Sequence, residues 1–189
     1  DAGQHMHPDE RVITMVANDT SIPSSIAQYF DSASSPLNPF NRNFKSYPYG
    51  TSFLFMAKFL AGPAGMEGYD RINLLGRFLS AIFDLGTVVL VFLLGCMGGF
   101  KTRPYNWWVG LLGAFLYATA ALAIQYSHFF VAESFTTFFL VLTLFLALRV
   151  YVVARHASPL HWAGYVGMGL ACGLALASKV SVALVLPVL

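Results

Sequence analysis

The segment RINLLGRFLSAIFDLGTVVLVFLLGCM, residues 71–97, decides the fold class of this chain. As an α-helix it would be about 40 Å long, enough to cross a hydrocarbon core about 30 Å thick and protrude from it. Of the 189 residues, 57% are hydrophobic and 11% are charged, whereas soluble domains carry about 25% charged residues. The sequence therefore predicts an all-α polytopic membrane protein. The net charge of +2 is too small to indicate a nucleic-acid partner.

Further apolar segments predict a transmembrane bundle over residues 74–189, with about four spans and the start of a fifth. After the first span, the expected helices cover residues 107–124, 135–153 and 162–178, and Lys179 precedes the fifth. Because the chain begins at Asp1 without a methionine and stops within an apolar run at Leu189, we expect further helices on both sides. As a fragment, it is expected to be inactive alone.

Residues 1–73 form a different region, which is polar, aromatic and rich in Pro, Asn and Ser. Its apolar segment Thr51–Ala61 is too short to span a bilayer and predicts an interfacial helix. Between residues 21 and 49, Ser-Pro and Asn-Pro pairs indicate a loop with turns.

The basic residues of the short loops predict the orientation of the bundle. Lys101 and Arg103 lie in one loop and Arg155 in another, and the positive-inside rule assigns their side to the cytoplasm. The opposite, extracytoplasmic side would then carry residues 1–73 and the helix ends near them. The charged residues expected on that side are Asp9, Glu10, Arg77, Glu133 and Lys179.

The segment HMHPDER, residues 5–11, contains the only adjacent acidic pair of the chain, Asp9 and Glu10. Pro8 suits the first turn of a helix, and acidic residues there face the positive end of the helix dipole. One interpretation is therefore a well-capped helix lying on the membrane surface. The other is a pair of carboxylates at the mouth of a membrane bundle, where they could take part in chemistry.

Charged residues within or beside the spans are costly and are therefore candidates for function. Arg77 either extends its guanidinium to the interface or binds a phosphate, and Lys179 has the same two interpretations. Asp84, two turns beyond Arg77, is expected to form an inward structural hydrogen bond. Glu133 can complement a helix dipole, and His128 is more typical of a hydrogen-bonding side chain than of a metal ligand.

Five blocks of the sequence together resemble a known family of membrane enzymes. They are HPDERVITMVAND, SPLNPFNRNFKSYPYGTSFLF, RFLSAIFDLGTV, QYSHFFVAESFTTFF and GLALASKVSVALVLP, in this order. The chain is similar to GT-C membrane glycosyltransferases, and most similar to the bacterial group related to protein O-mannosyltransferases. The resemblance implies a GT-C-like helix bundle whose first extracytoplasmic loop bears interfacial helices.

The resemblance also implies an activity and roles for individual residues. Such enzymes transfer a sugar, with inversion, from a polyprenyl-phosphate carrier to an acceptor at the extracytoplasmic face. Asp9 matches the general base on the acceptor hydroxyl, with Glu10 as its neighbour, and Arg77 matches a residue on the carrier phosphate. Further candidates are Lys179, Arg42 and Lys45 for the phosphate, and Glu133 with His128 at a second acidic position.

Several alternatives stay open from the sequence. The chain could instead be a non-catalytic membrane subunit that keeps the GT-C scaffold within a larger complex, or a transporter, which ranks last because most charges gather at one face. The acceptor could be a protein, a lipid or a glycan. The residues predict no metal site, and the need for a divalent cation is left open. The expected location is the bacterial plasma membrane.

Overall fold

The computed structural model describes residues 7–97, 107–155 and 162–184, and every regular element in these ranges is a helix. The predicted all-α fold class is therefore confirmed. Within these ranges, two short 3-10 helices, η1 and η2, accompany eight α-helices. The α-helices are α1 (Pro8–Asp19), α2 (Ile26–Phe30), α3 (Ser52–Ala61), α4 (Tyr69–Met97), α5 (Trp107–Ala118), α6 (Ala121–Ser127), α7 (Ala132–Arg155) and α8 (Trp162–Ser178), while η1 is Pro39–Arg42 and η2 is Val180–Leu184.

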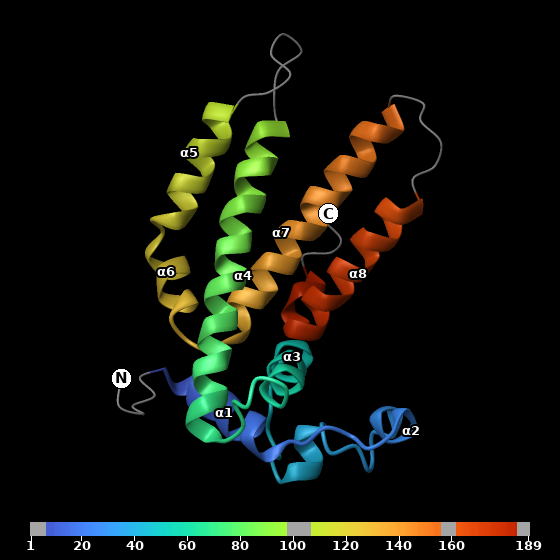
Figure 1. Ribbon diagram of the computed structural model, residues 1–189. Coiled ribbons are helices and arrows are strands. Elements are labelled where there is room, and N and C mark those ends of the chain that lie inside the picture. Colours follow the sequence, from blue (N-terminus) through green and yellow to red (C-terminus); the bar gives the residue numbers. More distant parts are fainter. Residues whose placement is uncertain (1–6, 98–106, 156–161, 185–189) are drawn as a thin grey trace.

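The helices divide into an upright bundle and a base that lies across one end of it (Figure 1). The helices α4, α5, α7 and α8 stand side by side, and α6 continues downward from α5. The helices α1, α2 and α3 lie at the lower end, close to the beginning of α4 and α7 and the end of α8. This end therefore gathers the segments in which the sequence predicts the functional residues.

In the described part of the chain, two helices, α4 and Ala132–Val152 within α7, are long and apolar enough to cross a membrane. The helices α5 and α6 add a third span if they are counted as one broken span, and α8 is a shorter apolar helix of 17 residues. The expected start of a fifth span contains the 3-10 helix η2, and residues 185–189 lie outside the described part of the chain.

The predicted span over residues 107–124 differs from the structure, which breaks it into α5 and α6 with a bend of 65°. At the break, the hydroxyl of Thr119 donates to the carbonyl of Phe115 at 2.8 Å, and Ala120 is extended with φ −69° and ψ 122°. A threonine that bonds to a carbonyl of its preceding turn tends to bend a helix. The pattern of apolar residues continues across the break, which is why the sequence suggested one helix.

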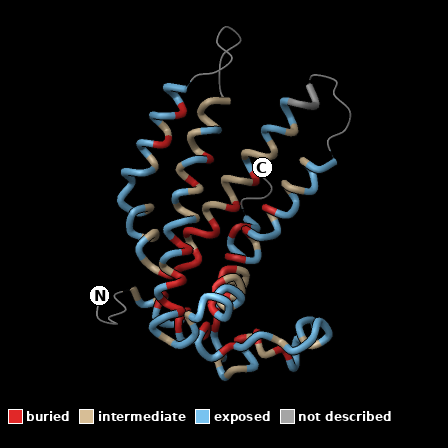
Figure 2. The backbone as a smooth tube through the Cα atoms, in the orientation of Figure 1, coloured by how far each residue is buried: buried red, intermediate tan, exposed pale blue. Residues whose placement is uncertain are grey.

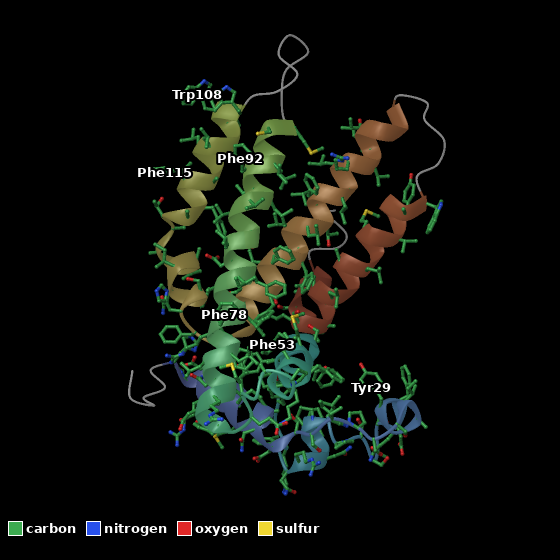
Figure 3. The ribbon with its side chains drawn as sticks, viewed as in Figure 1. Tyr29, Phe53, Phe78, Phe92, Trp108 and Phe115 are labelled. Carbon is green, nitrogen blue, oxygen red and sulfur yellow. The ribbon has the colours of Figure 1, made fainter. Side chains whose placement is uncertain are left out.

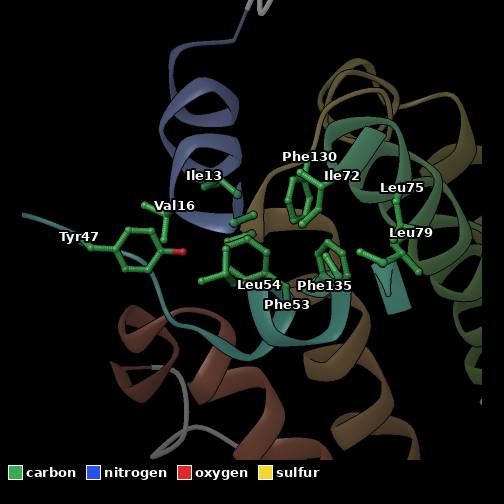
Figure 4. Packing of buried hydrophobic residues seen from close by; sticks show 14 residues of the cluster. Ile13, Val16, Tyr47, Phe53, Leu54, Ile72, Leu75, Leu79, Phe130 and Phe135 are labelled. Carbon is green, nitrogen blue, oxygen red and sulfur yellow. The ribbon is translucent and has the colours of Figure 1, made fainter. Parts of the chain in front are cut away.

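The main hydrophobic core lies where the base meets the bundle rather than along the spans. Figure 4 shows Phe53 of α3 between α1 and α7, with its ring 5.7 Å from that of Phe130 and 5.5 Å from that of Phe135. Ile13 and Val16 of α1 are fully buried in the same cluster. Figure 2 accordingly shows most buried residues near the lower end of the bundle. The core thus fixes the position of α1 against the spans.

The outer surfaces of the spans are apolar and exposed, as expected for helices that face lipid. Phe115 is 63% exposed on α5, and Phe78 is 62% exposed on α4 (Figure 3). Trp108 is exposed at the far end of α5 from the base, where its ring stacks on Trp107. Tryptophan is enriched at membrane interfaces, so this pair is consistent with the second boundary of the membrane. The orientation expected from Lys101, Arg103 and Arg155 rests on side chains outside the described part.

Candidate active site

The two acidic residues of HPDER differ in their surroundings once α1 has formed. Pro8 is in the first turn of α1, as the sequence predicts, with Asp9 and Glu10 beside it. Asp9 is partly exposed, whereas Glu10 is fully buried. The Glu10 carboxylate accepts from Nε and Nη2 of Arg77 on α4, each at 2.7 Å. An arginine that binds both oxygens of a carboxylate fixes orientation as well as distance.

A second polar contact lies one helical turn along the same two helices. Asn73 donates its side-chain amide to the hydroxyl of Thr14 at 3.0 Å, and both residues are buried. Glu10 pairs with Arg77, and Thr14 pairs with Asn73. From the first pair to the second, the residue number increases by four on α1 and decreases by four on α4. Residues four apart share a helix face, so α1 runs opposite to α4 at this contact. We call these four residues the α1–α4 ladder.

Another partner of Glu10 comes from the segment before α7. The backbone N–H of Phe130 donates to Glu10 Oε1 at 2.8 Å. Burial alone would raise the pKa of Glu10. The hydrogen bonds from Arg77 and Phe130 and the charge of Arg77 outweigh that effect and hold this pKa below its ordinary value of 4.5. Glu10 therefore stays ionised while it joins α1 to α4 and to the start of α7.

The space for Phe130 depends on a glycine of α4. A Cβ atom added to Gly76 would collide with the Phe130 ring. The ring therefore packs directly on the backbone of α4, one residue before Arg77. This close approach holds the Phe130 N–H within reach of Glu10.

At the same end of the bundle, Glu133 in the first turn of α7 pairs with Lys179 just after α8. The distance from Lys179 Nζ to Glu133 Oε1 is 2.7 Å, and the Glu133 and Lys179 side chains are 18% and 37% exposed. The second oxygen, Glu133 Oε2, is buried without a hydrogen-bond partner. Of the three donors of the lysine ammonium, one is directed at Glu133.

Tyr49 stands next to these acidic residues because its loop is attached to the end of α8. The N–H of Gly50 donates to the carbonyl of Ser178 at 3.1 Å, and the hydroxyls of Ser52 and Ser178 are 2.7 Å apart. Burial, a hydrogen bond to Asp9, and the charges of Asp9 and Glu133 all raise the pKa of Tyr49 well above its ordinary value of 10. Its phenol is thus protonated at neutral pH and can donate to Asp9.

The remaining predicted residues lie elsewhere in the base or on the surface. Arg42 donates from Nη2 to the hydroxyl of Ser21 at 2.9 Å, and Lys45 is exposed. His128 is exposed, with Nδ1 2.6 Å from the carbonyl of Ile124. The described residues contain no group of three or more His, Cys, Asp or Glu side chains that could hold a metal ion.

Comparison with known proteins assigns the chain to a family. The sequence profile described as dolichyl-phosphate-mannose-protein mannosyltransferase matches residues 60–189. The chain belongs to this mannosyltransferase family. Separate comparisons with curated proteins and with solved structures gave no match.

Membership of the mannosyltransferase family confirms the resemblance seen in the sequence. At a coarse level it makes the chain an integral membrane glycosyltransferase that uses a polyprenyl-phosphate donor and a protein acceptor. The match includes Arg77, Glu133 and Lys179 but begins after Asp9 and Glu10. The α1–α4 ladder joins the segment before the match to the matched spans.

Sequence reasoning missed the residues that hold the predicted ones in place. Thr14, Asn73 and the backbone of Phe130 carry no charge and received no role, although the four-residue spacing of Glu10 to Thr14 and of Asn73 to Arg77 was available. Tyr49 was part of a quoted block but received no role. Asp84, predicted to form an inward structural hydrogen bond, accepts one from the Tyr117 hydroxyl at 2.8 Å.

Proposed function

We propose that this protein transfers a sugar, with inversion, from a polyprenyl-phosphate carrier to a protein hydroxyl, and that Asp9 is the general base. The observation that carries the proposal is the burial of Glu10 against Arg77, which sets the partly exposed Asp9 beside Tyr49 at the end of the bundle. A carboxylate in reach of solvent can take a proton from an incoming hydroxyl. Family membership supplies the donor class.

In this reaction, Asp9 removes the proton of the acceptor hydroxyl as the oxygen attacks the anomeric carbon of the sugar. The bond between that carbon and the phosphate oxygen breaks, and its electron pair stays on the released polyprenyl phosphate. Cations stabilise the charge that develops there. Lys179 has donors not directed at Glu133, and we assign the positive charge of Arg77 to the same phosphate. Glu10 acts as a positioning residue through Arg77.

The replacement Asp9→Asn tests the assignment of the base, with Asp19→Asn at the other end of α1 as the matched control. Sugar transfer from the lipid-linked donor to an acceptor peptide is measured in membranes that contain the protein. We expect Asp9→Asn to lower the rate by about 100-fold or more, because general bases contribute at least this much. Asp19→Asn should transfer at the wild-type rate.

If the Asp9→Asn variant transferred sugar at the wild-type rate, the assignment of Asp9 as the general base would be refuted. That result would favour the alternative of a non-catalytic membrane subunit within a larger complex. NMR of the product tests inversion, since an inverting enzyme gives the opposite anomer to the donor.

We place the active site on the extracytoplasmic face of the plasma membrane. Ser24→Cys introduces a thiol at an exposed position of the base, and the background variant replaces Cys96 and Cys172 by Ser. A membrane-impermeant maleimide should label Ser24→Cys in intact cells. Labelling only after cell lysis would place the base in the cytoplasm and overturn this orientation.

A further inference from the structure

A cavity of about 240 Å³ lies between α4, α7 and the α5–α6 break. Its position in the middle of α4 and beside the break places it among the helices that cross the membrane. One end of the cavity reaches the first turn of α7, where Glu133 pairs with Lys179. The residues that line it include Asp84, Tyr117, Ala120, Ala123, Glu133 and Thr137.

The walls of this cavity are mostly apolar, and most of its polar atoms that have a partner bond to neighbouring groups, whereas Glu133 Oε2 is buried without a hydrogen-bond partner. The hydroxyl of Tyr117 donates to Asp84 at 2.8 Å, and the hydroxyl of Ser134 donates to the carbonyl of Tyr126 at 3.2 Å. Glu133 Oε1 is engaged by Lys179 at 2.7 Å. A space lined by carbon with a few fixed polar groups suits a largely apolar ligand.

The break between α5 and α6 creates the room for such a ligand. Ala120 is extended at the break, and Ala123 lies one turn later with a side chain that fills little of the space. Leu122 lies between them and is 62% exposed. The outward-facing apolar residues of α5 are exposed too. The bend therefore faces hydrocarbon, so a lipid chain can enter the cavity from the membrane without crossing water.

We infer that this cavity holds the first isoprene units of the polyprenyl-phosphate carrier and that the carrier phosphate lies at Lys179. This assignment rests on the proposed function. The anionic phosphate cannot lie in the cavity itself, where it would meet the carboxylates of Asp84 and Glu133. A chain that leaves the cavity at Glu133 emerges beside the Lys179 ammonium, which is partly exposed. It also emerges near Tyr49, which is affected by the charges of both Glu133 and Asp9.

The variant Ala123→Phe fills the cavity, and Ala121→Phe adds the same side chain two residues earlier on α6, at an exposed position outside the cavity lining. Transfer kinetics are measured in membranes with a polyprenyl-phosphate sugar as the varied substrate. We expect Ala123→Phe to raise KM for this donor by about tenfold with little change in kcat, and Ala121→Phe to leave both constants unchanged. Equal effects of the two variants, or unchanged KM in Ala123→Phe, would overturn the inference.

A photoreactive probe makes the test independent of turnover. A polyprenyl phosphate with a diazirine on its first isoprene units should label residues 117–137 in the wild-type protein and in Asp9→Asn, and label Ala123→Phe less. Unlabelled polyprenyl phosphate without a sugar should compete. Equal competition by a bilayer phospholipid, or competition by the free sugar alone, would assign the cavity to another ligand and refute the inference. Labelling of an inactive Asp9→Asn variant separates this question from the role of the base.

Discussion

Arg77 of α4 holds both carboxylate oxygens of Glu10 on α1 at 2.7 Å, although 67 positions separate the two residues in the chain. The carboxylate is fully buried, and the Arg77 side chain is 18% exposed. A buried pair of this kind adds little net stability compared with apolar packing, but it specifies which surfaces meet. Here it specifies where α1, and therefore Asp9, lies against the spans.

The first prediction concerns the loss of this pair. Glu10→Gln should destabilise the protein by about 3 kcal/mol, because it leaves the Arg77 charge in a largely buried site without its counter-charge. The control is Arg11→Gln, the next residue on α1, which is exposed and should have an effect within about 0.5 kcal/mol. Thermal unfolding in detergent, followed by size-exclusion chromatography, measures both. A Glu10→Gln protein as stable as Arg11→Gln would show that the pair does not hold α1.

The second prediction is the pH dependence of the same contact. The pKa of Glu10 is lower in the folded protein than its ordinary value of 4.5. The stabilisation from its ionised form is therefore fully present above about pH 4.5 and is lost as the pH falls through the lower, folded-state pKa. Unfolding temperatures of the wild type and Glu10→Gln should converge as the pH is lowered through this window. A difference that stays constant down to the most acidic measurable pH would contradict the prediction.

The third prediction uses the close approach of Phe130 to α4. Gly76→Ala should destabilise the protein by about 1–3 kcal/mol, because the added Cβ displaces the Phe130 ring and the N–H that binds Glu10. Gly169→Ala on α8 is the matched control, since nothing lies within 4 Å of the added atom. That change should be neutral or stabilising by about 0.5–1 kcal/mol. Equal stability of the two variants would mean that the ring moves aside without cost.

The fourth prediction concerns the Tyr49 phenol. Tyr49→Phe removes the donor that faces Asp9 and should lower kcat of sugar transfer by about tenfold, with the unfolding temperature nearly unchanged because the side chain is partly exposed. Tyr29→Phe removes a hydroxyl from an exposed ring of the base and should leave kcat unchanged. If kcat were unaltered in Tyr49→Phe, the Tyr49 hydroxyl would have no role in sugar transfer and its contact with Asp9 would be only structural.

The sequence by itself determined the class of the fold and the approximate extent of α3, α4, α7 and α8. Long apolar segments can cross a bilayer only as helices, because backbone groups must be satisfied within the segment. This constraint predicted α4 and α7, and the turn and capping residues predicted α1 and α3. The same pattern could not reveal the break at Ala120, because apolar residues continue on both sides of it.

Only the tertiary structure decided which of two adjacent carboxylates is buried and which is accessible. Asp9 and Glu10 are chemically similar and one residue apart, so neither pattern nor composition separates them. Successive residues on a helix point about 100° apart, and the face of α1 that meets α4 is set by Arg77 and Asn73 from a distant segment. The pairing of Glu133 with Lys179 was likewise decided by the meeting of α7 and α8, because side chains 46 positions apart interact only after the helices have packed.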